Sequence, residues 1–329
     1  MNPQARQFIK LRAVVRRTWP WAMGLAIVVF VARKVPFEAF REAIGNGPRP
    51  ALIAVELAVV LVALVTDAAA TWVALVVTNL RRPLGEVAAV RGASFVLFLV
   101  NYILGQGAFG YYLKRTGAAG LQAAGVTLFL VGTNLAALLL LCTLAWGMRG
   151  EDLDTKVWLT LVAGCIAFAV YLAIIALAPR LLAQRAILAP LFDAGLRGHA
   201  LAIAGRLPYI IVMSLGPWIA IRVWGIPVPF AAAASTMPIV VIASALPIAP
   251  AGLGTMQASM VYFFTPFAQG ATADDQAAHV FAFSIVHFVY MVLATLLVGL
   301  ACVPFARRSG NLPPMKPEPD PNPAIQDPR

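Results

Sequence analysis

The sequence predicts an all-α membrane protein, a polytopic transmembrane helical bundle of about seven or eight membrane segments. Hydrophobic residues make up 61% of its 329 residues and charged residues only 12%, a balance far from that of a soluble domain. Apolar stretches long enough to cross the hydrocarbon core, which takes about 20 residues of helix, recur along the chain. Basic residues gather at the ends of these stretches.

We divide the chain into a basic N-terminus (1–18), a transmembrane domain (19–308) and a proline-rich tail (309–329) that we expect to be disordered. Six stretches predict membrane spans: 19–35, 51–80, 118–147, 156–178, 200–224 and 278–304. Two further apolar regions, 88–113 and 228–267, contain helix-breaking residues. The second is long enough for two passes, or for a pass and a re-entrant hairpin.

The charges predict a bacterial-type cytoplasmic membrane protein with both termini in the cytoplasm, because cytoplasmic flanks accumulate Lys and Arg. This topology requires residues 93–115 to enter and leave the membrane on the cytoplasmic side. Basic flanks contain Arg81, Arg82, Arg91, Arg180, Arg185, Arg197, Arg307 and Arg308. Acidic connections contain Glu151, Asp152, Asp154, Asp274 and Asp275. The basic loop with Arg41 and Arg49 would lie outside. Residues 180–197 suit either an amphipathic interfacial helix or a plain connector.

Several function classes find no support in the residues. The three cysteines are widely separated, so they offer neither a metal-ligand spacing nor a disulfide framework. Gly105 to Gly110 matches the dinucleotide pattern G-x-G-x-x-G, but a membrane span precedes it where a buried strand is required. We expect no enzyme, catalytic residue, metal or cofactor, and no nucleic-acid partner.

Two clusters of helix breakers are the best candidates for a working site: Leu104 to Gly110 and Pro247 to Gly254. Inside a bilayer, an interrupted helix is tolerated only where protein or a water-lined cavity satisfies its backbone groups. Paired broken helices build the midplane sites of many transporters. We therefore expect broken or re-entrant helices around 101–113 and 247–257 that form the walls of a central cavity. The alternative is two unrelated kinks.

Charges within the apolar runs are costly and therefore also candidates. Glu56 and Asp67 lie eleven residues apart, about three helical turns, so they share one face of their span. Asp67 could line a headgroup path or pair with a neighbouring helix. Arg206 could meet a lipid phosphate or an acid such as Asp67, or extend to the cytoplasmic interface. His279 and His287 suggest packing or interfacial roles more than a proton relay.

The stretches NYILGQGAFGYYLKRTG and ALPIAPAGLGTMQASMVYFF resemble the lysylphosphatidylglycerol synthase transmembrane family of flippase-like proteins. We expect no soluble aminoacyltransferase domain of the kind that the fused relatives carry, and therefore no headgroup-charging reaction. The resemblance implies substrate-binding roles for Asn101, Gly105, Gln106, Gly107, Tyr112, Pro250, Gly252, Gly254 and Gln257. Gln106 and Tyr112 stand where relatives carry charge, and Gln257 stands where an acid is common. We therefore expect a weakly charged cargo.

The resulting hypothesis is a multi-pass protein of the cell membrane that binds a lipid or lipid-linked headgroup and moves it between the leaflets. Its partners would be membrane lipids. The alternative is an accessory or scaffold subunit of a lipid-modifying or glycosyl-transfer system, which would dock through the proline-rich tail.

Overall fold

The computed structural model describes residues 36–100, 102–147, 155–245 and 249–309, with a few positions between 25 and 33. These residues form helices and no strand, which confirms the all-α prediction. The principal helices are α2 (Phe37–Asn46), α3 (Arg49–Val77), α4 (Leu84–Phe98), α5 (Tyr102–Arg115), α6 (Gly120–Gly147), α7 (Thr155–Leu177), α8 (Arg180–Ala183), α9 (Ala189–Val223), α10 (Phe230–Ala245), α11 (Thr255–Phe264) and α12 (Ala273–Ser309). Short 3₁₀ turns cover Pro250–Gly252 and Thr265–Phe267.

Five of these helices, α3, α6, α7, α9 and α12, are long and apolar enough to cross a membrane. They confirm the predicted spans that begin near residues 51, 118, 156, 200 and 278. The predicted N-terminal segment, most of the span at 19–35, and residues 310–329 of the predicted disordered tail lie outside the described residues.

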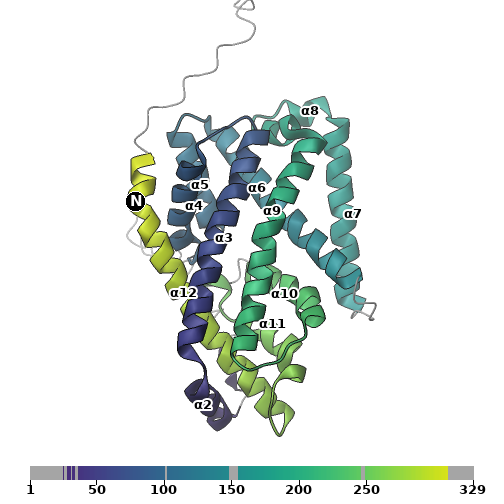
Figure 1. Cartoon of the computed structure of the whole chain (residues 1–329). Helices are drawn as coiled ribbons and strands as arrows, with labels where there is room; N and C mark the ends of the chain where they lie inside the picture. Colours follow the sequence, from purple (N-terminus) through teal and green to yellow (C-terminus); the bar gives the residue numbers. More distant parts are fainter. Residues whose placement is uncertain are drawn as a thin grey trace, which may run out of the picture.

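The centre of the bundle is the antiparallel pair α3 and α9, which run side by side through the molecule (Figure 1). Small residues on α9 allow this close approach, as is common between membrane helices. A methyl group added at Gly216 would lie 2.6 Å from the Val59 side chain, and one at Gly205 would lie 3.5 Å from that of Val73. This packing brings the middle of α9 against the middle of α3.

The two regions with helix breakers form hairpins of half-length helices. The α4–α5 hairpin lies in the half of the molecule that contains α8, whereas α10 and α11 lie in the opposite half, near α2 (Figure 1). Helices of 15, 14, 16 and 10 residues are each too short to cross the hydrocarbon. The predicted re-entrant segments are therefore present, and they enter the bundle from opposite ends.

The position of the first break differs from the prediction. The Gly-rich cluster at 104–110 lies inside α5, and the interruption falls before it, between Phe98 and Tyr102. The glycines serve helix packing instead: a methyl group on Gly105 would lie 2.2 Å from the Phe98 ring, and one on Gly110 would lie 2.7 Å from the Thr127 hydroxyl.

A continuous interfacial helix over 180–197 is not formed. The region contains the single turn α8, a run of turns, and the first residues of α9. Proline stands at the start of α9, where it favours a new helix over the continuation of an old one, and the chain kinks at Gly195. The connector reading of this segment is therefore closer to the structure.

Candidate functional site

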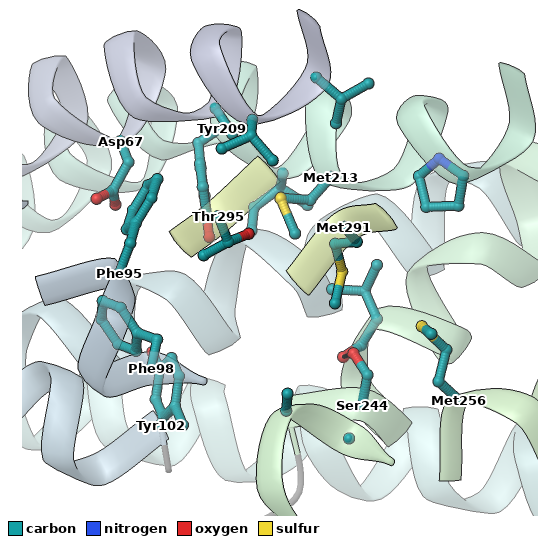
Figure 2. A pocket seen from close by; sticks show the side chains of 18 of the residues that line it. Asp67, Phe95, Phe98, Tyr102, Tyr209, Met213, Ser244, Met256, Met291 and Thr295 are labelled. Atoms are coloured by element: carbon teal, nitrogen blue, oxygen red, sulfur yellow. Dashed lines mark hydrogen bonds between the residues drawn. The ribbon is translucent and has the colours of Figure 1, made fainter. Parts of the chain in front are cut away.

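A cavity of about 230 Å³ lies between the tips of the two hairpins. A buried water takes about 10–15 Å³ of such space, so the cavity has room for a group the size of a lipid headgroup. Figure 2 shows Phe98 and Tyr102 on one side of it and Ser244 and Met256 on the other. Its walls are mostly apolar, but Asp67, Arg91, Arg206, Glu56 and His287 also line it.

Asp67 joins three helices at one end of the cavity. Its carboxylate accepts two hydrogen bonds from Arg91 of α4, at 2.6 Å from Nε and 3.0 Å from Nη2. Arg206 of α9 donates a third from Nη1, at 2.5 Å. All three side chains are at most 4% exposed. The cluster holds two guanidinium groups against one carboxylate, so it retains one positive charge in a place that excludes bulk water.

The fold places these groups at depth. Asp67 lies ten residues before the end of α3, about 15 Å along the helix. The packing of α3 against α9 sets Arg206 beside it, so the contact with Asp67 is the one of the alternatives considered for Arg206 that this structure contains. Arg91 reaches Asp67 because α4 packs against α3: a methyl group on Gly92 would lie 3.2 Å from the Leu64 side chain of α3.

Arg91 is further held by α5. Its Nη1 donates to Gln106 Oε1 at 3.1 Å, and Gln106 Nε2 donates to the Tyr102 hydroxyl at 2.9 Å. The guanidinium also lies 5.2 Å from the ring centre of Phe98 and 5.5 Å from that of Phe109. The α4–α5 hairpin therefore presents Arg91 to the cavity in a fixed orientation.

Glu56 and His287 form a second polar pair at the cavity wall, with 2.5 Å between the Glu56 carboxylate and His287 Nδ1. Glu56 lies on the same face of α3 as Asp67, as predicted, about 16 Å away along the helix. His287 stacks on Phe283, with 5.4 Å between ring centres. Its buried Nε2 has no partner among the described residues. The prediction that His287 packs between helices agrees with this position.

Several residues predicted from the first cluster lie away from the cavity. Gly105 packs against Phe98, and Gly107 is exposed with nothing within 4 Å of an added methyl group. The Tyr112 hydroxyl donates to Glu86 near the base of the hairpin. Asn101 lies outside the described residues. Of the residues predicted there, Gln106 is the described one that reaches the cavity.

The second cluster shapes the tip of the α10–α11 hairpin. Gly252 lines the cavity with φ of +73°, and a methyl group on it would lie 2.6 Å from the Ser244 carbonyl oxygen. Gly254 precedes α11, and its N–H donates to the side chain of Gln257 at 2.6 Å. Gln257 is thus a helix-capping residue and does not line the cavity. The backbone of Pro250 belongs to the 3₁₀ turn at this tip.

Arg91 is the central functional candidate that the sequence prediction missed. The sequence context predicts a cytoplasmic flank for it, because it follows Arg81 and Arg82. An arginine inside the apolar run from Val87 to Val100 was nevertheless the signal that could have identified it, because charges at membrane depth are rare and mark functional sites.

The fold and the site define a polytopic helical membrane protein with an internal charged cavity between two re-entrant hairpins. The chain belongs to the family described as Lysylphosphatidylglycerol synthase TM region, whose model matches residues 11–295. A comparison with curated proteins gives no match.

Proposed function

We propose that this protein binds the headgroup of a membrane lipid in the central cavity and moves it between the leaflets. The observation that carries the proposal is the position of the cavity: it lies between two hairpin tips that come from opposite ends of the bundle (Figure 1). A headgroup at this position has left one surface of the membrane and is on its way to the other.

The buried charges support this role. Charged side chains at membrane depth are expensive and commonly mark substrate pathways. In this protein, charged side chains from α3, α4 and α9 line the same cavity. The remaining walls of the cavity are apolar, which suits lipid acyl chains. Membership in the family adds a second line of support, because the family's description refers to the membrane region of a lipid synthase.

The charge distribution favours a defined orientation in a cytoplasmic membrane. The end of the bundle with α8 carries an excess of basic residues, which include Arg81, Lys114, Arg115, Arg180, Arg185, Arg307 and Arg308. The opposite end has no such excess, because its basic residues Arg41, Arg49 and Arg222 are balanced by Glu38, Glu42, Asp274 and Asp275. The positive-inside rule assigns the α8 end to the cytoplasm. The α4–α5 hairpin then enters from the cytoplasm and the α10–α11 hairpin from outside.

Reconstitution tests the proposal. The purified protein is placed in liposomes that contain trace fluorescent phospholipids of anionic, zwitterionic and phosphate-free classes, and a membrane-impermeant quencher is added outside. We expect quenching to continue beyond the outer-leaflet share for at least one class, in protein-containing liposomes and not in protein-free ones. Quenching that stops at the outer-leaflet share for each class contradicts the proposal.

A further inference from the structure

We infer that the cavity binds the phosphate ester of an anionic lipid and that Arg206 is the residue that holds it. The inference rests on the proposed function and adds the chemical class of the cargo. It replaces the expectation of a weakly charged cargo, which considered the residues of the Gly-rich cluster and not Arg91.

The two arginines differ in how many of their donors are occupied. Arg91 donates from Nε, Nη1 and Nη2 to Asp67 and Gln106. Arg206 makes one hydrogen bond among the described residues, from Nη1 to Asp67. Its Nε is buried without a partner, although the side chain is only 3% exposed and lines the cavity. A buried charged donor without an acceptor is costly, so this edge of Arg206 suits a ligand that brings one.

The shape of the unpaired edge matches an oxyanion. A guanidinium presents its N–H groups in a planar fork that fits the oxygens of a phosphate or a carboxylate. Among membrane lipids, the phosphate ester is the group that offers such oxygens near the acyl chains. The net positive charge of the cluster of Arg91, Arg206 and Asp67 attracts the phosphate. The ring of Tyr209 lies 5.6 Å from the Arg206 guanidinium and restrains the orientation of that guanidinium from one side.

The same geometry disfavours a cationic headgroup. Both oxygens of Asp67 already accept hydrogen bonds from arginines. The other acid of the cavity, Glu56, pairs with His287. A headgroup amine would therefore meet a net positive cluster without a free carboxylate. The described cavity therefore favours a phospholipid without a cationic group in its headgroup over a phospholipid that carries one.

Asp67 competes with the ligand for Arg206. Asp67 Oδ1 accepts a hydrogen bond from Nη1 of Arg206, so it offers an internal partner when the phosphate leaves. Removal of the Asp67 charge frees Arg206 and leaves two uncompensated guanidiniums. This change must strengthen anion binding and slow anion release, which is the opposite of the effect of a change at Arg206.

Lipid binding to the purified protein in detergent micelles tests the inference, with native mass spectrometry as the readout. The ligands are phosphatidylglycerol, phosphatidylcholine, diacylglycerol and inorganic phosphate. The variants are Arg206→Lys, which keeps the charge but loses the fork, Arg206→Gln and Asp67→Asn. Arg222→Lys is the matched control, because Arg222 is on the same helix and donates to the Val228 carbonyl, away from the cavity.

We expect the wild type to bind phosphatidylglycerol most tightly and diacylglycerol least. Arg206→Lys should weaken phosphatidylglycerol binding by about tenfold or more, in line with the loss of a charged hydrogen bond. Asp67→Asn should strengthen it, and Arg222→Lys should leave it unchanged. The opposite signs at Arg206 and Asp67 separate a binding role from a loss of folding, which would weaken binding in both variants.

Equal binding of phosphatidylglycerol and diacylglycerol to the wild type would overturn the inference, as would unaltered binding by both Arg206 variants. Tight binding of inorganic phosphate without lipid binding would assign the site to the free anion and reject a lipid cargo. Selective phosphatidylglycerol binding without transbilayer movement would keep the phosphate site and reject transport. Movement of all lipid classes at equal rates would keep transport and reject phosphate selectivity.

Discussion

Asp67 illustrates how single side chains organise the interior of this protein. Its carboxylate is fully buried, so its charge is acceptable only because Arg91 and Arg206 approach it from two other helices. Gln257 stabilises the backbone in a similar way, because its side-chain oxygen accepts a hydrogen bond from the N–H of Gly254 at the buried start of α11. The sequence alone identified both residues as candidates, but their roles follow from partners that are distant in the sequence.

Replacement of Gln257 tests its capping role. Gln257→Ala removes the acceptor for the Gly254 N–H, and loss of a cap costs about 1 kcal/mol. We expect a lower thermal midpoint in detergent, measured by circular dichroism. Gln257→Glu retains an oxygen at the same place, so it should keep more of the stability than the alanine variant. A Gln257→Ala protein as stable as the wild type would contradict the capping role.

At the scale of elements, the spans were predictable and the breaks were only partly so. Runs of about 20 apolar residues predict α3, α6, α7, α9 and α12 because the bilayer thickness fixes their length. The break before Tyr102 carries no such signal. The glycines after it appeared to mark an interruption, but they allow α5 to pack against Phe98 and Thr127. Whether a glycine breaks a helix or packs it depends on tertiary neighbours.

Two glycines contrast a position that requires glycine with one that does not. Gly252→Ala places a methyl group 2.6 Å from a backbone carbonyl at a residue with φ of +73°, so we expect marked destabilisation and loss of lipid movement. Gly107→Ala, in the exposed face of α5, meets nothing within 4 Å. It should leave stability unchanged or raise it by up to about 1 kcal/mol. Thermal unfolding in detergent measures both, and equal effects of the two substitutions would contradict this assignment.

At the scale of the whole molecule, two half-length hairpins meet inside a bundle of full-length helices (Figure 1). Each hairpin returns to the end from which it enters, and both its tip and the inner faces of its two helices line the cavity. This arrangement leaves the polar groups of the tips inside the protein, where irregular backbone is tolerated at membrane depth. The sequence predicted the paired interruptions, but Arg91, which belongs to α4, became visible as a site residue only through the fold.

The opposite entry of the two hairpins can be measured by site-directed labelling. In a variant without the three native cysteines, a single cysteine is placed at Lys114, beside the base of α4–α5, or at Gln269, beside the base of α10–α11. We expect a membrane-impermeant maleimide to label position 269 in intact cells and position 114 only after the membrane is permeabilised. Labelling of both positions from the same side would contradict the proposed topology.

The transbilayer rate of a fluorescent phosphatidylglycerol in proteoliposomes, compared between two tryptophan variants of α12, tests the transport role of the cavity most directly. Thr295 lines the cavity, whereas Leu297 on the same helix is 62% exposed on the outer surface of the bundle. Thr295→Trp should therefore block the cavity and abolish movement, while Leu297→Trp should move lipid at the wild-type rate. Equal rates for the wild type and a folded Thr295→Trp protein would show that lipid does not pass through this cavity.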